Sequence, residues 1–125
     1  MWSNPEFLAG LDHYRAGRHW EAHEAWEPLW RNAGDPDVRR LMQGLIQVAA
    51  SMHKAQTQRD GAAAARILSR ALEKLEPLPH TLCGIHVERL RSDARGCLAQ
   101  LRSGSPEPRG NAASEHLIVP TIERG

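Results

Sequence analysis

The stretch from about Asp37 to Gln58 constrains the fold more than any other part of this chain. Read as a helix, it carries apolar side chains on most of its sides: Leu41, Met42, Leu45, Ile46, Val48, Ala49, Ala50 and Met52. A helix that is apolar nearly all round is covered by neighbouring elements rather than laid on a surface. We therefore predict a buried helix here, with further helices packed around it.

Start and stop signals predict the other helices. Asn4-Pro5 and Asp35-Pro36 each place a capping side chain before a proline at the first helical position, a combination typical of helix starts. Gly17 and Gly34 supply stops. The predicted helices begin near Pro5, run from about 18 to 33, from 37 to 58, from 62 to 75, and from 86 to 101, with residues 77–85 as a connector.

No segment shows the alternation of a strand, so the prediction is all-α. We expect a single-domain antiparallel helical bundle of about five helices over residues 1–102, with residues 103–125 as a flexible or extended C-terminal tail. The stretch 103–113 is rich in Gly, Pro, Ser and charge, which favours flexibility. The apolar residues 117–119 and Ile122 predict an extended segment laid on the bundle or on a partner.

Composition excludes several classes of partner. The chain has sixteen Lys and Arg residues and fifteen Asp and Glu residues. It therefore lacks the basic excess that would predict a nucleic-acid partner. No run of about 18 apolar residues predicts a membrane span, and residues 1–9 lack the pattern of a secretory signal. Cys83 and Cys97 have no metal-ligand spacing and are expected to be reduced thiols. We expect a cytoplasmic protein. The sequence is also compatible with a homo-oligomer.

The candidate site lies in residues 20–30. At about 100° per residue, one side of this helix gathers five aromatic, imidazole and carboxylate side chains: Trp20, His23, Glu24, Glu27 and Trp30. Buried carboxylates are costly unless they are paired or bound to a cation. The third helix offers facing partners in Gln43, Gln47 and His53. We expect a polar pocket between these two helices, with Trp20, Trp26 and Trp30 as its floor.

Three functions are compatible with this cluster. It is a structural network that fixes helix register, a metal site, or a metal-free site for a small polar or cationic ligand on the indoles. In the metal reading, His23 and Glu27 bind zinc, manganese or iron, Glu24 is the general base, and His53 is a ligand or proton donor. Trp20, Trp30, Gln43 and Gln47 are the ligand-binding residues in either site. The match to the zincin pattern is partial, because Glu27 occupies the second histidine position.

The other histidines are expected to be solvated or capping side chains, His13 and His19 among them as exposed residues beside the first turn. The same prediction covers His80 and His86 at the connector and His116 in the tail.

Several of these motifs together resemble a known family. Trp20-Glu21-Ala22-His23-Glu24, Glu27 with Trp30, and Gln43-Gly44-Leu45-Ile46-Gln47 with His53 resemble the bacterial and archaeal family called domain of unknown function 309, over roughly residues 6 to 101. The resemblance implies a small, cytoplasmic, all-helical bundle of unestablished biochemistry. The family has been described as a predicted metal-dependent hydrolase, so the resemblance also implies this activity. The motif positions of the family in this sequence are His23, Glu24, Glu27, Trp30, Gly44, Gln47 and His53.

Overall fold

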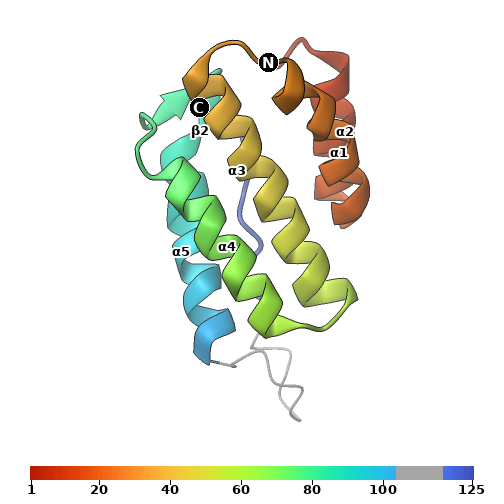
Figure 1. The fold of residues 1–125 in the computed structure, drawn as a ribbon, viewed down its shortest axis with the longest axis vertical. Coiled ribbons are helices and arrows are strands. Elements are labelled where there is room, and N and C mark those ends of the chain that lie inside the picture. The colour runs from red at the N-terminus through yellow and green to blue at the C-terminus, as the bar shows by residue number, and fades with distance from the viewer. Residues whose placement is uncertain (104–116) are drawn as a thin grey trace.

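The computed structural model describes residues 1–103 and 117–125, and over these residues the predicted all-α bundle is confirmed. The described chain has five α-helices, of which each packs against the next one in sequence. They are α1 (Pro5–Arg15), α2 (His19–Asn32), α3 (Pro36–Met52), α4 (Gly61–Leu75) and α5 (Val87–Ser103). Figure 1 shows α3, α4 and α5 side by side, with α1 and α2 forming a separate pair beside α3.

The helix starts follow the capping rules that the sequence predicts. The Asn4 side chain accepts a hydrogen bond from the Phe7 amide, and the Asp35 side chain accepts from the amides of Asp37 and Val38. Gly17 has φ +83°, which glycine adopts at no steric cost, so the chain turns there between α1 and α2. These local signals explain why three of the helix boundaries are accurate.

The core is centred on α3, as its all-round apolar pattern predicts. Nine of its residues are buried: Leu41, Met42, Gly44, Leu45, Ile46, Val48, Ala49, Ser51 and Met52. A Cβ added at Gly44 would lie 2.7 Å from the Leu75 side chain, so the glycine permits close approach of α4. The only buried hydroxyl on α3, that of Ser51, donates to the Ala64 carbonyl of α4 at 2.8 Å. The contact between α3 and α4 is therefore both close and fully hydrogen-bonded at this point.

The predicted third helix is too long as an α-helix. The α-helical geometry ends at Met52, and the chain continues as a π-helix, η1 (His53–Thr57). The amide of Gln58 bonds to the His53 carbonyl at 3.2 Å, and that of Asp60 bonds to the Lys54 carbonyl at 2.9 Å. Arg59 then turns the chain with φ +55° before the Asp60 side chain caps α4. Short π-helical turns occur frequently at functional sites.

The predicted connector holds a small antiparallel hairpin of β1 (Thr81–Leu82) and β2 (Ile85–His86). Strands of two residues are too short to show an alternating pattern, which is why the sequence did not predict them. Gly84 at the turn has φ +76°, and its carbonyl accepts a hydrogen bond from Trp2 Nε1 at 2.7 Å. The N-terminus is thereby held against the hairpin.

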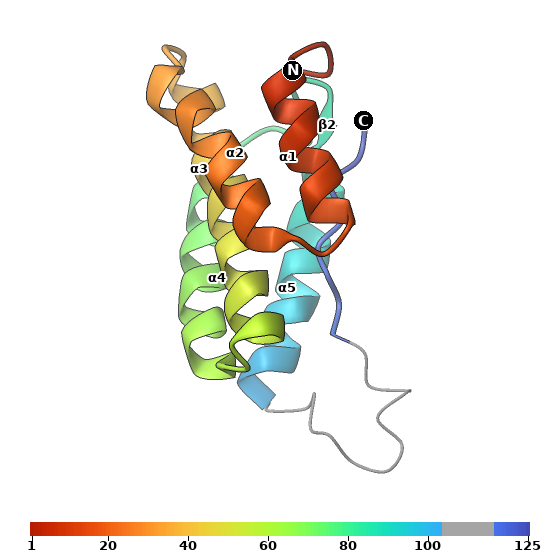
Figure 2. The same ribbon diagram turned by 90° about the vertical axis from the view of Figure 1, so that its right-hand side faces the viewer.

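Residues 117–125 form an extended segment on the bundle, one of the two expected arrangements. The Tyr14 hydroxyl donates to the Pro120 carbonyl at 2.6 Å, and the Arg15 guanidinium donates to the Ile122 carbonyl at 2.9 Å. Arg124 forms an isolated bridge with Ile85. Figure 2 shows this segment running beside α1 and α5. Most of the predicted flexible stretch 103–113, and also His116, lie outside the described residues.

None of the helices in residues 1–103 combines the length and the apolar character needed to cross a membrane.

Candidate functional site

The rotation of α2 is set by Trp26, and it differs from the predicted one. The Trp26 indole is fully buried; its ring lies 6.0 Å from that of Phe7 and from that of Tyr14, and its Nε1 donates to the Phe7 carbonyl at 3.1 Å. A Cβ at Gly10 would fall 2.2 Å from the same indole, so α1 leaves room only for this ring. Trp26 is therefore part of the core rather than the floor of a pocket, which corrects that expectation.

This rotation moves part of the predicted inward stripe to the surface. The buried side of α2 consists of His19, Ala22 and Trp26. Trp20 is 43% exposed and Glu24 is exposed, so the prediction that both face the interior is wrong. Packing of the large Trp26 ring outweighs the polar stripe, because apolar burial determines which face of a helix turns inward.

His19 was expected to be exposed and is instead buried at 4% exposure, beside the Tyr14 ring at 5.2 Å. Burial, and then the electrostatic influence of the nearby His53, lower the pKa of His19 below its ordinary range. His19 is therefore a histidine that the fold keeps neutral. A periodic signal existed for it, since His19 lies three residues before Ala22 and seven before Trp26.

His23 and Glu27 form the only contact seen between the predicted metal ligands among the described residues. His23 Nε2 lies 3.8 Å from Glu27 Oε2, with the side chains 18% and 30% exposed. The other Glu27 oxygen accepts from Arg31 Nη2 at 2.6 Å. The Glu27 carboxylate is thus already paired with a cation one turn away on its own helix.

Three of the predicted site residues do come together, around the Trp20 indole. The His23 imidazole stacks on it with ring centroids 4.5 Å apart and planes 9° from parallel. The His53 imidazole of the π-helix lies 5.4 Å from it at 40°. Nε2 of His53 is also 3.5 Å from the Gln58 amide nitrogen. Trp20, His23 and His53 therefore form one cluster at the edge of the bundle.

A pocket of about 390 Å³ opens beside this cluster, and we name it the Trp20 pocket. Its lining residues come from α2, α3, the π-helix and its end, and α4: Trp20, Ala50, His53, Lys54, Gln58 and Ile67. Lys54 and Gln58 were not among the predicted site residues. Lys54 shares a helical line with Gln43, Gln47 and Ala50, so the spacing contained a signal for it; nothing in the sequence pointed to Gln58.

The remaining predicted ligand-binding residues lie elsewhere. Gln43, Gln47 and Trp30 are half-buried and do not line the Trp20 pocket. The Arg39 guanidinium lies over the Trp30 ring at 5.1 Å from its centroid. The structure thus divides the predicted site into the Trp20 cluster and a separate region around Trp30.

Four buried polar atoms lack a hydrogen-bond partner among the described residues. They are Nδ1 of His19, Nδ1 of His23, Nε1 of Trp30 and Oε1 of Gln47. Three belong to α2, and the fourth belongs to α3, against which α2 packs. Buried polar atoms are nearly always paired in folded proteins. The contact between α2 and α3 therefore has hydrogen-bonding capacity that the described side chains do not use.

The described residues contain no group of three or more His, Cys, Asp or Glu side chains placed to hold a metal ion. His23 and Glu27 supply two, while Glu24 is exposed and His53 packs on Trp20. The assignments of His23 and Glu27 as metal ligands, and of Glu24 and His53 as catalytic groups, stay predictions.

Fold and site together define a small all-helical protein with an aromatic and imidazole cluster at the edge of its central helix. The model of a family described as "Domain of unknown function (DUF309)" matches residues 7–66, and the chain belongs to this family. The match spans α1 to the first part of α4 and so includes the whole Trp20 cluster. It is shorter than the expected extent of 6 to 101. No curated protein matches the chain.

Proposed function

We propose that this protein is a binding module for a small molecule, and that the Trp20 pocket is its site. The observation that carries the proposal is an exposed indole beside an unpaired lysine in one hollow of about 390 Å³. This volume lies within the range of about 300–1,000 Å³ that is typical of small-molecule sites.

The lining residues suggest a flat ligand. Leaving a large indole 43% exposed gives up part of the free energy that burial would contribute. His23 stacks on this indole and so holds the ring in one orientation. A planar molecule packing on Trp20, between the apolar side chains of Ala50 and Ile67, would recover that burial.

The lining residues also suggest that the ligand carries a negative charge. The Lys54 side chain has no hydrogen bond or ion pair in the described part of the chain, and no carboxylate lines the pocket. His53 and Gln58 add polar nitrogen atoms at the same wall. An ammonium group with an amide donor suits a carboxylate, because hydrogen bonds to a charged partner are about twice as strong as neutral ones.

The metal-dependent hydrolase is the second candidate, and one observation favours it: the one-turn pair of His23 and Glu27, 3.8 Å apart. A divalent ion such as zinc, manganese or iron would need at least one more protein ligand than this pair provides. Binding without catalysis needs no such addition, so we rank it first.

Two further properties belong to the proposal. Cys83 and Cys97 are both free thiols, which suits a reducing cytoplasmic location. Association into a homo-oligomer also remains a prediction.

The test uses benzoate as the probe and neutral benzamide as its matched control ligand. Binding is followed by NMR through the indole N–H signal of Trp20, assigned by comparison with a Trp20→Phe variant. We expect benzoate to shift this signal saturably and more strongly than benzamide. Lys54→Gln should weaken benzoate binding about tenfold and leave benzamide unaffected, in line with the loss of a charge-assisted contact.

Lys74→Gln is the control variant, because Lys74 is the only other lysine of the chain and does not line the pocket. An equal loss of benzoate affinity in both variants would mean that net charge, and not the pocket, attracts the anion. Absence of any saturable shift with either ligand would refute the binding module.

A further inference from the structure

A second hollow is lined by residues of α4 and of the end of α5. We name it the α4–α5 groove. It has a volume of about 300 Å³ and is lined by Ala65, Arg66, Ser69, Arg70, Glu73 and Arg102. Three of these six residues are arginines. It shares no lining residue with the Trp20 pocket.

The side chains of the three groove arginines have no partner in the described part of the chain, a property that they share with Arg40 and Arg59. In α1, α2 and α5, the side chain of each described arginine before Arg102 donates a hydrogen bond. Examples are the bonds from Arg15 to Ile122 and from Arg95 to Glu76. The side chains of Arg66, Arg70 and Arg102 make no hydrogen bond or ion pair in the described part of the chain. A guanidinium has five N–H donors in a planar arrangement that matches carboxylate and phosphate oxygens. The groove therefore has three guanidinium groups with unused donors along one hollow.

Charge is distributed unevenly over the fold. From Pro36 to Leu75 the chain has seven Lys and Arg residues but only three Asp and Glu. Two of these three acids, Asp37 and Asp60, belong to helix starts, and the Asp60 side chain caps α4. Glu73 is the only acid in residues 36–75 that does not lie at a helix start. The near-neutral whole chain thus contains a region with a clear positive excess.

Three cations follow one another on successive turns of α4, and we call Arg66, Arg70 and Lys74 the α4 cation row. Like charges four residues apart destabilise a helix. Glu73, three residues after Arg70, is the one acid at helical spacing beside this row. The row therefore keeps a net positive charge, and a bound anion would offset the repulsion that is left.

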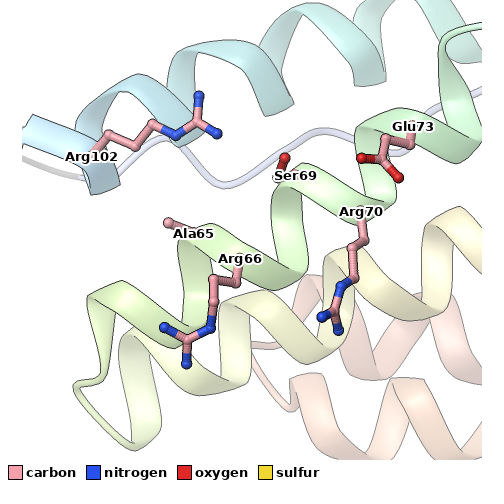
Figure 3. A pocket seen from close by; sticks show the side chains of 6 residues that line it. All are labelled: Ala65, Arg66, Ser69, Arg70, Glu73 and Arg102. Atoms are coloured by element: carbon pink, nitrogen blue, oxygen red, sulfur yellow. The ribbon is translucent and has the colours of Figure 1, made fainter.

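The geometry of the groove admits an anion. Figure 3 shows Arg66 and Arg70 extending from α4 to the side away from α5, one turn apart, while Arg102 lies on α5. The small side chains of Ala65 and Ser69 lie on α4 between these arginines and leave room for a ligand. The Ser69 hydroxyl adds a donor there, and Glu73 bounds the groove at one end.

We propose that the α4–α5 groove is a binding site for a small multivalent phosphate ligand, held by Arg66, Arg70 and Arg102. Phosphate is favoured over a carboxylate here because three arginines line one hollow, and a guanidinium group can bind phosphate oxygens in bidentate fashion. This site is independent of the proposed function of the Trp20 pocket.

Tripolyphosphate is the probe, titrated into the full chain by calorimetry at about 20 mM salt and again at about 200 mM, because phosphate binding by arginines weakens with ionic strength. We expect saturable binding to one site. Arg66→Gln combined with Arg70→Gln should weaken it about tenfold or more, since two charged contacts are lost.

The control variant combines Arg40→Gln with Arg59→Gln. It removes the same net charge from two exposed arginines that also lack partners in the described chain but do not line the groove. Its affinity should change less than about threefold, which is the effect of the general field alone. Glu73→Gln should strengthen binding, because it removes the one negative charge of the groove. Far-UV circular dichroism verifies that all variants are folded.

Equal losses in the two double variants would overturn the site in favour of general charge attraction. Absence of saturation at the lower salt concentration would overturn it as well. A short single-stranded oligonucleotide, titrated in parallel, distinguishes the source of the phosphate groups. Binding of the oligonucleotide without binding of tripolyphosphate would overturn the small-ligand assignment.

Discussion

Arg91 offers the sharpest prediction about what holds the bundle together. It is 3% exposed, and its Nη1 donates to the carbonyls of Leu75, Glu76 and Leu78 at 2.8, 3.1 and 2.6 Å. Nε and Nη2 donate to one oxygen of Glu88 at 3.0 and 2.8 Å. The last carbonyls of a helix have no partner within the helix. Arg91 on α5 therefore caps the end of α4 from outside.

Replacing this side chain by methionine keeps most of its apolar stem and removes all of its donors. The bonds to Leu75 and Leu78 are buried. The Leu75 carbonyl would keep the Leu78 amide as a partner at 3.2 Å, whereas the Leu78 carbonyl would be left unsatisfied, which costs about 1–3 kcal/mol. We therefore expect Arg91→Met to lower the free energy of unfolding by about 1–3 kcal/mol, mainly through the Leu78 carbonyl, because the Glu88 side chain is 43% exposed and its carboxylate can be solvated by water. Against a total of about 5–15 kcal/mol, this is a large fraction.

Arg95→Met is the matched control, one turn further along α5. Arg95 forms a two-point contact with the Glu76 carboxylate, but both side chains are about half exposed. Exposed pairs of this kind contribute about 0–1 kcal/mol. Urea denaturation followed by circular dichroism measures both variants. If Arg91→Met costs no more than Arg95→Met, the carbonyls of α4 do not depend on Arg91 and the reasoning is refuted.

Three further predictions concern histidine, the tail and the thiols. Burial and then His53 lower the pKa of His19 from its ordinary 6.5, so below this pH the unfolded chain binds a proton that the folded chain excludes. The free energy of unfolding should therefore be highest above pH 6.5 and fall as the pH drops below it, and His19→Phe should reduce the difference in Tm between about pH 7.5 and pH 5. Tyr14→Phe removes the hydroxyl that bonds to the Pro120 carbonyl, so it should cost about 1 kcal/mol and speed amide exchange in residues 118–123; unchanged exchange would mean that other contacts hold the tail. Burial raises the pKa of Cys97 to about 12 and also raises that of Cys83, so a thiol reagent should label the half-buried Cys83 slowly and the buried Cys97 only on unfolding; rapid labelling of both in the folded protein would contradict these environments.

Local signals account for the parts of the fold that the sequence predicted well. Asn4 and Asp35 cap their helices through side chains that lie next to them in sequence, and the all-round apolar pattern of residues 41–52 places α3 at the centre. Such features depend on neighbours within a few residues. The end of α3 was harder to predict, because a π-helix differs from an α-helix in hydrogen-bond register and has no distinct pattern of residue types.

The site was predicted with mixed success for a related reason. The helical spacing correctly brought Trp20, His23 and His53 into one candidate region, and the rings do meet. It placed Glu24 inside and His19 outside, and both assignments are wrong. A helical pattern shows which residues share a side but leaves open which side is buried when apolar and polar groups are mixed.

The sequence by itself determined the fold class, the helix starts and the family, because these depend on local capping, on the period of apolar residues and on short motifs. Only the tertiary structure decided how α2 is rotated, since that follows from the fit of the Trp26 ring beside Gly10 and Phe7. The same holds for the Trp20 pocket and the α4–α5 groove, which gather residues from helices far apart in the chain. Spacing along the sequence does not predict such groups of residues, because packing between helices, and not distance along the chain, sets which side chains share a surface.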